Sequence, residues 1–173
     1  MAIKCLAEQM PNATPYRFRL VETDDLALLA RWRAAPHVIE WWGPQDESEE
    51  VAEPDVAKWI VEFEGRPFAY AQDYDPHAWD GHHFAHLPTG SRGVDQFIGE
   101  ADLLNCGHGS TFVRQHVVRL FAEGAPAVGT DPHPHNVRAI RAYEKSGFRR
   151  TGGPTGTHWG EVILMECWHS VPT

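Results

Sequence analysis

The pattern of apolar and polar residues along the chain predicts strands alternating with helices. Residues 16–21 (YRFRLV) alternate between apolar and polar side chains, which is typical of a strand. Leu26 and Leu29 then follow at helical spacing, with Thr23 as a predicted N-cap and Pro36 as the residue that stops the run. The first part of the chain is therefore expected to be a strand followed by one helix.

A second helix is predicted after an acidic stretch at residues 45–53. Pro54 occupies a favourable first-turn position, and one helical face would carry Val56, Trp59, Ile60 and Phe63. Gly65 would end this helix. The acidic stretch is interpreted as a solvated loop, although its carboxylates also suit the attraction of a polycation.

The rest of the chain predicts strands interleaved with two more helices. A helix is expected at residues 110–123, and another from Asn136 as N-cap to Gly147 as stop. Between and after them, strands are predicted at residues 67–74, 94–104, 125–129, 148–151 and 161–168. The order describes one mixed α/β domain around a single sheet, spanning residues 1–173, with 1–15 as an N-terminal extension.

Composition and charge exclude several classes of function. Hydrophobic residues make up 42% of the chain, and no apolar run is long enough to span a membrane. The net charge is −9, and a basic face that would bind nucleic acid is missing. The three cysteines (Cys5, Cys106 and Cys167) are widely spaced, which favours reduced thiols in a cytoplasmic protein.

A candidate anion site lies where a predicted strand gives way to a helix, in L-L-N-C-G-H-G-S (residues 103–110). Gly107 and Gly109 let the backbone approach a ligand closely, and the free amides of the following helix attract a diphosphate. The segment lacks the lysine of the mononucleotide P-loop and does not complete GxGxxG. On these residues alone, a tight strand-to-helix turn explains the pattern equally well.

A second motif follows at residues 130–148, T-D-P-H-P-H-N-V-R-A-I-R-A-Y-E-K-S-G-F. Together the two segments resemble the acyl-coenzyme-A-binding core of the GNAT superfamily of N-acetyltransferases. With E-W-W-G (residues 40–43), Y-A-Q (70–72) and R-G-V-D-Q-F-I-G-E (92–100), the chain is similar to the aminoglycoside 6′-N-acetyltransferase branch. The resemblance covers roughly residues 16–168.

The resemblance implies an α/β (α+β) fold with a mixed, mostly antiparallel, splayed sheet flanked by about four helices. It also implies an enzyme that transfers acetyl from acetyl-CoA to an amine of an aminoglycoside or similar polycationic molecule. Two alternatives stay open. One is a siderophore-assembly acyltransferase that acts on a hydroxylamine-bearing lysine derivative, and the other is a non-catalytic domain that binds coenzyme A or an aminoglycoside. The expected oligomeric state is a monomer or homodimer.

The resemblance also assigns roles to particular residues. The catalytic residues it implies are Asp95 and Tyr143. Cofactor-binding roles are implied for Leu103, Leu104, Cys106, Gly107, His108, Gly109, Ser110, Thr111, Asn136, Ala139 and Tyr143. Acceptor-binding roles are implied for Trp41, Trp42, Gln72, Asp73, Asp95, Glu100 and Asp131. Leu104, where the superfamily usually has Gln or Arg, and His108, where the branch usually has an apolar residue, depart from the family pattern.

The chemistry of amine acylation can use a carboxylate and a hydroxyl such as those of Asp95 and Tyr143. An ammonium group must be bound and lose a proton before it can attack a thioester, and a carboxylate such as Asp95 suits both tasks. The departing thiolate needs a proton or a dipole, which the hydroxyl of Tyr143 can supply. On residue type alone, a strand-end aspartate that bonds local amides is the favoured interpretation of Asp95, and the family resemblance reverses that preference.

Aromatic and histidine residues invite two further interpretations. One of Trp41 and Trp42 is expected in the core, and the other as an apolar or cation–π wall for the acceptor. The histidine groups, His82, His83 and His86 in one loop and His133 and His135 in another, lack the spacing of a zinc site, so no metal is expected.

Overall fold

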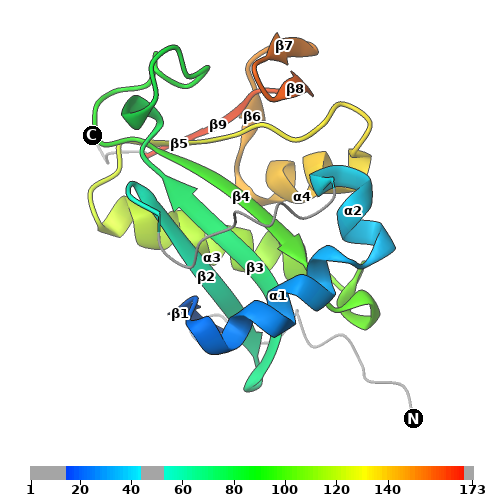
Figure 1. The fold of residues 1–173 in the computed structure, drawn as a ribbon. Helices are drawn as coiled ribbons and strands as arrows, with labels where there is room; N and C mark the ends of the chain where they lie inside the picture. The colour runs from blue at the N-terminus through cyan, green and yellow to red at the C-terminus, as the bar shows by residue number, and fades with distance from the viewer. Residues whose placement is uncertain (1–14, 44–52, 170–173) are drawn as a thin grey trace.

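A computed structural model describes residues 15–43 and 53–169 (Figure 1). One large sheet has the strand order β1-β2-β3-β4-β5-β9-β6, and β7 and β8 form a separate hairpin. The strands are β1 (Tyr16–Leu20), β2 (Val56–Phe63), β3 (Arg66–Tyr74), β4 (Arg92–Ile98), β5 (Ala127–Thr130), β6 (Arg149–Arg150), β7 (Thr155–Thr157), β8 (Gly160–Val162) and β9 (Met165–Trp168). The α-helices are α1 (Leu26–Arg33), α2 (Pro36–Trp42), α3 (His108–Ala122) and α4 (Val137–Ser146).

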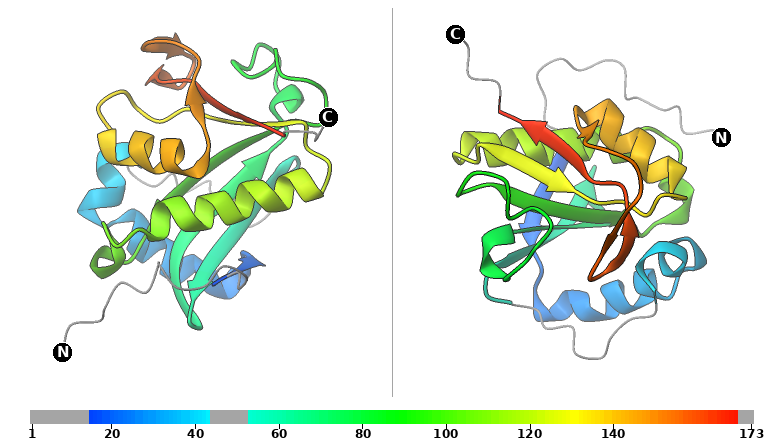
Figure 2. Two further views of the ribbon diagram at one scale, coloured as in Figure 1. Left: turned by 180° about the vertical axis from the view of Figure 1, so that it is seen from behind. Right: turned by 90° about the horizontal axis from the view of Figure 1, so that it is seen from above.

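The helices cover both faces of the sheet (Figure 2). Helices α1 and α2 lie on one face, and α3 and α4 lie together on the other. Each face has its own apolar core, because sheet side chains point alternately to opposite faces. The α1/α2 core includes Trp32, Val38, Ile60, Tyr70 and Phe97. The larger α3/α4 core includes Val61, Phe68, Val94, Phe112, Val113, Val117, Leu120, Val128, Ile140, Tyr143 and Met165.

The sheet is antiparallel except where β4 meets β5. These two strands run parallel and pair only through Arg92 with Val128 and Gly93 with Gly129, after which they separate. The other neighbouring strands of this sheet pair antiparallel. The predicted fold class, a mixed and mostly antiparallel splayed sheet with four helices, is confirmed.

Two glycines face each other at the last paired position before the strands separate. A Cβ added to Gly93 would lie 2.2 Å from the ring of Tyr74, and one added to Gly129 would lie 2.9 Å from the ring of Phe84. An aromatic ring therefore packs directly on the backbone of each strand at this point. Any side chain here would displace one of these rings, so glycine is required at both positions.

The helix predicted from Pro54 to Gly65 is wrong, because the structure has strand β2 there. The segment is buried from both faces of the sheet. Ile60 packs in the α1/α2 core and Val61 in the α3/α4 core. A strand covered on both faces carries a near-continuous apolar run, in which helical and extended spacing look alike.

The first predicted helix is interrupted. A short 3₁₀ turn at Thr23–Asp25 precedes α1, and its N-cap is Glu22 rather than Thr23, in a capping box with Asp25. Pro36 ends α1 as expected but also begins α2, since proline is well tolerated in the first turn of a helix. Helix α2, which carries both Trp41 and Trp42, was not predicted from the sequence.

The two later helices and their caps agree with the predictions. The side chain of Asn136 accepts a hydrogen bond from the amide of Ala139, and Gly147 ends α4 with a left-handed backbone at φ 107°. Helix α3 begins two residues earlier than expected, at His108. Within the two described ranges, helices long and apolar enough to cross a membrane are absent.

Helix α3 is anchored to the sheet through the buried carboxylate of Asp73. This carboxylate accepts hydrogen bonds from Trp59 on β2 (2.7 Å) and Arg92 on β4 (2.7 Å). From α3, His116 lies 3.1 Å and Arg119 lies 3.2 Å from the same carboxylate. Burial alone would raise the pKa of Asp73, but the surrounding donors lower it to about 2.

Replacing this carboxylate should destabilise the fold. Asp73→Asn removes the buried negative charge with which Arg92 and Arg119 pair, so we expect the free energy of unfolding at pH 7 to fall by about 3 kcal/mol. Because the folded-state pKa lies below the ordinary value of 3.8, the stabilisation is present above that value and disappears as the pH falls toward 2. Urea unfolding across this pH range measures it.

The matched control is Asp80→Asn, an exposed aspartate on a neighbouring loop. We expect it to change stability by less than about 0.5 kcal/mol. Equal stability of the Asp73→Asn variant and the wild type at pH 7 would contradict the anchoring role.

Candidate active site

Two adjacent cavities lie beside the separation of β4 and β5. The first, of about 500 Å³, is called the acidic cavity because Asp95 and Asp131 lie on its wall. The second, of about 440 Å³, is called the cradle cavity because it reaches the N-terminus of α3. The residues common to both walls are Trp41, Trp42, Gln96, Asn136 and Ala139. Two ligand groups bound in the two cavities would therefore meet beside β4 and the start of α4.

The N-terminus of α3 presents unsatisfied backbone amides to the cradle cavity. Gly107, the N-cap, has a left-handed backbone at φ 85° and provides no side-chain cap. The hydroxyls of Ser110 and Thr111 donate to the carbonyl of Gly107, so they do not occupy the amides. Free amides and the positive helix end together form a site for a phosphate or diphosphate.

Helix α4 adds positive charge to the same cavity. Arg138, Arg141 and Lys145 all lie on its wall. None of the three forms an ion pair with another described residue. In a chain with a net charge of −9, this local excess of cations favours an anionic ligand in the cradle cavity.

Asp95 is held in the acidic cavity by a short hydrogen-bonded chain from β3. The hydroxyl of Tyr70 donates to Oε1 of Gln72 (2.8 Å), which turns Nε2 of Gln72 toward Asp95. That amide donates to Oδ2 of Asp95 at 2.9 Å. Gln72 and Asp95 are directly paired across the β3–β4 ladder, so the backbone register sets this contact.

The environment of Asp95 opposes its ionisation. Burial and the negative charge of Asp131 raise its pKa to about 7, against the opposing effect of the hydrogen bond from Gln72. A carboxylate with such a pKa takes up and releases protons near neutral pH, as a general base must. Two close carboxylates also form a strong site for a cation.

Tyr143 closes the inner wall of the acidic cavity. It lies on α4, is 4% exposed, and packs edge-on against Phe148. Burial, and after it the negative charge of Asp95, raise the pKa of its phenol well above the ordinary value. The hydroxyl therefore stays protonated and able to donate a hydrogen bond over the whole physiological pH range.

Trp41 and Trp42 separate in the way expected of adjacent aromatic residues. The ring of Trp42 packs edge-on against Phe97 (5.1 Å) and lies under the guanidinium of Arg33 (4.5 Å). The ring of Trp41 lies 5.7 Å from that of His133, at the junction of the two cavities. Trp42 is thus the tryptophan that packs on the core, although part of it also borders both cavities.

Comparison with known proteins identifies the family. The acetyltransferase (GNAT) domain family matches residues 22–153. An aminoglycoside N(6′)-acetyltransferase type 1 from Klebsiella pneumoniae is 37% identical over 161 residues, covering 85% of this chain and 80% of that protein. The chain belongs to the GNAT acetyltransferase family. Within it, the chain falls in the branch of the aminoglycoside N(6′)-acetyltransferases.

Solved structures of this GNAT branch share the fold. The structure of AAC(6′)-Ib in complex with paromomycin and acetyl-CoA matches with a TM-score of 0.81 and 34% identity, over 88% of this chain and 93% of that one. The structure of the same enzyme with coenzyme A and kanamycin matches with a TM-score of 0.80 and 34% identity, over 88% and 94%. These are the ligands named for that enzyme.

Most of the residues predicted for the GNAT site lie on the two cavity walls. The acidic cavity brings together Trp41, Trp42, Gln72, Asp95, Asp131, Asn136, Ala139 and Tyr143. The cradle cavity brings together Leu104, Gly107, Gly109 and Ser110 with Asn136 and Ala139. Their individual roles remain predictions.

Four predicted cofactor residues lie outside both described walls. His108 turns away from the cradle cavity, and its Nδ1 lies 2.9 Å from the hydroxyl of Tyr16. Leu103 packs against the α3/α4 core, and the thiol of Cys106 contacts the carbonyl of Leu104 at 3.5 Å. Thr111 contacts the carbonyl of Gly107. Of the four, His108 lies in the first turn of α3, where backbone amides lack intrahelical partners.

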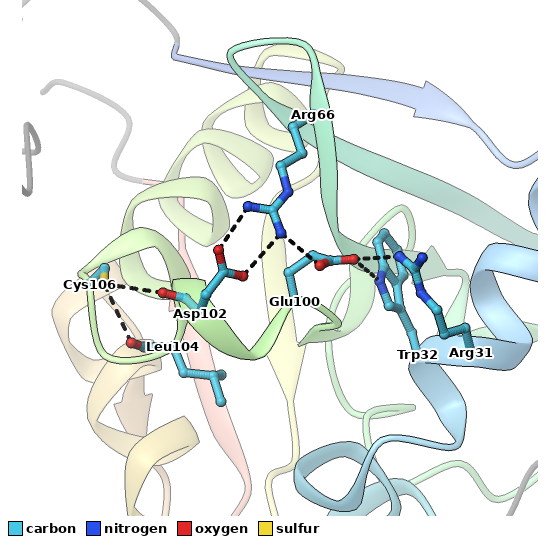
Figure 3. Close-up of polar contacts among 7 residues, drawn as sticks. All are labelled: Arg31, Trp32, Arg66, Glu100, Asp102, Leu104 and Cys106. Carbon is cyan, nitrogen blue, oxygen red and sulfur yellow. Dashed lines mark hydrogen bonds and ion pairs between the residues drawn. The ribbon is translucent and has the colours of Figure 1, made fainter. Parts of the chain in front are cut away.

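Asp73 and Glu100, both predicted to bind the acceptor, lie away from the acidic cavity. Asp73 points to the opposite face of β3 from Gln72 and anchors α3. Glu100 accepts hydrogen bonds from Trp32 (2.7 Å), Arg31 (2.6 Å) and Arg66 (2.7 Å), as Figure 3 shows. Both carboxylates are thus used by the protein's own donors, and their assignment to the acceptor site is corrected.

Several residues of the acidic cavity were not predicted from the sequence, including Gln96, Tyr74, Trp79, His82, His83, Trp159 and Glu161. The sequence offers His82 and His83 only as candidate metal ligands, and the described residues contain no metal-binding cluster. Trp159 and Glu161 arrive on the β7–β8 hairpin, whose position over the cavity is a tertiary feature. Gln96 directly follows Asp95 on β4, but neighbouring strand residues point to opposite faces, so this adjacency gave no sequence signal for its place on both cavity walls.

The raised pKa of Asp95 predicts a cost in stability. A carboxyl group with a folded-state pKa above 3.8 favours the folded state at low pH, and this contribution is lost as the pH rises toward 7. Asp95→Asn removes that penalty, so at pH 8 its melting temperature should exceed that of the wild type by about 2–4 °C. At pH 5 the difference should shrink. Thermal unfolding at both pH values measures this, and an Asp95→Asn variant less stable than wild type at pH 8 would contradict it.

Proposed function

We propose that this chain transfers the acetyl group of acetyl-CoA to an amine of an aminoglycoside, the 6′-amine being suggested by its relatives. The observation that carries the proposal is the placement of a carboxylate pair, Asp95 and Asp131, beside a helix N-terminus that suits a diphosphate. The two sites lie on opposite sides of one junction. A cationic acceptor and a phosphorylated donor would each meet the opposite charge.

The donor side fits the shape of coenzyme A. Its diphosphate would bind the free amides of α3, with Arg138 and Arg141 adding positive charge. Its extended arm would follow the edge of β4 that β5 leaves unpaired beyond Gly93. The thioester would then lie near the junction of the cavities, beside Asn136 and Tyr143.

On the acceptor side, Asp95 binds the ammonium and removes a proton from it. The freed lone pair attacks the thioester carbonyl, a carbon–nitrogen bond forms, and the carbon–sulfur bond breaks. Gln72 orients the carboxylate throughout, because its own amide is fixed by Tyr70. Asp131 binds the same cation and supports the elevated proton affinity of Asp95.

The leaving thiolate is stabilised by the protonated phenol of Tyr143. A hydroxyl with a raised pKa keeps its proton in the ground state and donates a hydrogen bond to the developing negative charge on sulfur. Of the two protons that the ammonium loses, one neutralises the thiolate and one is released to solvent, so each turnover yields a neutral amide, a free thiol and one proton.

Turnover is the direct test of this proposal. We expect acetylation of kanamycin or tobramycin by acetyl-CoA, detected as a mass gain of one acetyl group. In Asp95→Asn we expect kcat/KM to fall by about 100-fold, since general-base catalysis is lost. In the wild type kcat/KM should rise with pH through the pKa of Asp95, about 7, because only the ionised carboxylate accepts a proton.

Assays with other acceptors and acyl donors separate the acetyltransferase from the two alternative functions. Turnover of N-hydroxylysine with longer acyl donors, and none of aminoglycosides, would identify a siderophore-assembly acyltransferase instead. Binding of coenzyme A and kanamycin by calorimetry without any product would identify a non-catalytic binding domain. Asp80→Asn, whose carboxylate is exposed and outside both described walls, is the control and should retain wild-type rates.

The donor site has an independent test at Gly109. A methyl group there would make only ordinary contacts, 3.8 Å to Ile98 and 3.9 Å to Ala142, so Gly109→Ala should fold and bind coenzyme A normally. The larger side chain of Gly109→Leu would fill part of the cradle cavity. We expect its dissociation constant for coenzyme A to rise by about 10-fold or more, measured by calorimetry. Unchanged binding in Gly109→Leu would place the donor elsewhere.

A further inference from the structure

His83 lies against the carboxylate pair of the acidic cavity. Its Nε2 is 3.0 Å from Oδ2 of Asp131, and the two side chains are only 11% and 14% exposed. Asp131 in turn interacts with Asp95. The three side chains therefore form a row, His83–Asp131–Asp95, with the base proposed above at its inner end. In the acetyl transfer proposed for this site, His83 has no assigned role.

Aromatic packing fixes the imidazole of His83 in this position. The ring stacks on His82 at 4.2 Å, contacts Phe84 at 4.6 Å and meets Trp159 edge-on at 5.5 Å. Neither ring nitrogen is satisfied by a hydrogen bond within the described residues. A buried polar ring without such a bond is uncommon, and here its free edge lies against a carboxylate.

His83 is the basic side chain that faces this group of carboxylates. From the β5–α4 loop Asp131 faces it, and Asp95 on β4 and Glu161 on β8 add negative charge to the same cavity wall. Tyr74 on β3 is a neutral phenol whose pKa is raised by burial. Burial and the neighbouring His83 lower the pKa of His82 to about 4, so His82 is neutral at pH 7.

We propose that His83 is a positioning residue for acetyl transfer, which orients Asp131 and keeps the Asp131–Asp95 pair anionic so that Asp95 can act as the base. This inference rests on the proposed function. Without a positive partner, two close carboxylates share a proton and only one of them ionises. A proton shared in this way would occupy the carboxylate that must accept one from the acceptor amine. A protonated His83, whose Nε2 lies 3.0 Å from Oδ2 of Asp131, would offset that repulsion.

The test is the pH dependence of kcat/KM in His83→Gln. Removing the positive partner strengthens proton binding by the Asp131–Asp95 pair. The acidic limb of the pH profile, over which kcat/KM rises with pH, should therefore move to higher pH by about one unit. On that limb, kcat/KM would be about 10-fold below wild type, and at pH 9 the two should agree within about 3-fold. A merely structural role would lower activity at every pH and leave the limb in place, and that result would overturn the proposal.

Two further variants make the result specific. His86→Gln removes a histidine from the same loop, but His86 pairs with Glu166 (2.7 Å), is 54% exposed and lies outside the described wall of the acidic cavity. It should leave the pH profile unchanged, and a shift equal to that of His83→Gln would overturn the proposal. In an Asp131→Asn background, His83→Gln should cause no additional shift, because the intermediary carboxylate is gone.

A readout without substrate separates this inference from the proposed function. Carbon-13 NMR of the Asp95 carboxyl group, in free wild-type protein and in His83→Gln, reports the coupling whether or not any aminoglycoside is acetylated. We expect a higher titration midpoint for Asp95 in the variant. An unchanged midpoint in a variant whose near-ultraviolet circular dichroism is native would overturn the proposal, even if the wild type acetylates kanamycin.

Discussion

The separation of β4 from β5 is the constraint on which the rest of the site depends. The strands are held together by only two residue pairs, and the second pair is Gly93 with Gly129. Tyr74 and Phe84 pack directly on these glycines, so the aromatic side chains occupy the space where strand side chains would otherwise stand. Beyond this point the edge of β4 lacks a β5 partner, and both cavities open beside it. If β4 and β5 were paired along their whole length, neither cavity would form.

The fold could be predicted from the sequence wherever a local signal decides the structure. The cap at Asn136 and the stop at Gly147 depend on residues within one turn, and both are found where expected. Strand β2 could not be recognised, because Ile60 and Val61 are buried against different helices and the apolar run has no single period. Helix α2 was missed because Pro36, which follows the end of α1, is also the first residue of α2.

The residues of the site that belong to sequence motifs could be predicted. Gly107, Asn136 and Tyr143 belong to a recognisable pattern, and all three border the cavities. Asp73 and Glu100 were misplaced, because whether a carboxylate faces a ligand or an internal arginine depends on packing partners distant in sequence. His83 and Trp159 were not assigned to the acceptor site, because they lie in loops whose sequences show neither a family motif nor a hydrophobic period. Only the folded structure brings these loops to the cavity.

Strand β3 contacts both the acidic cavity and helix α3 through two neighbouring residues. Gln72 points to one face and holds Asp95, while Asp73 points to the other and holds α3. Because strand side chains alternate, a shift of β3 by one position would exchange them. The carboxylate would then enter the acidic cavity, and an amide would face the arginines behind the sheet. Insertions or deletions within β3 are therefore far more damaging than those in the surrounding loops, and natural length variation in such a chain is expected outside this strand.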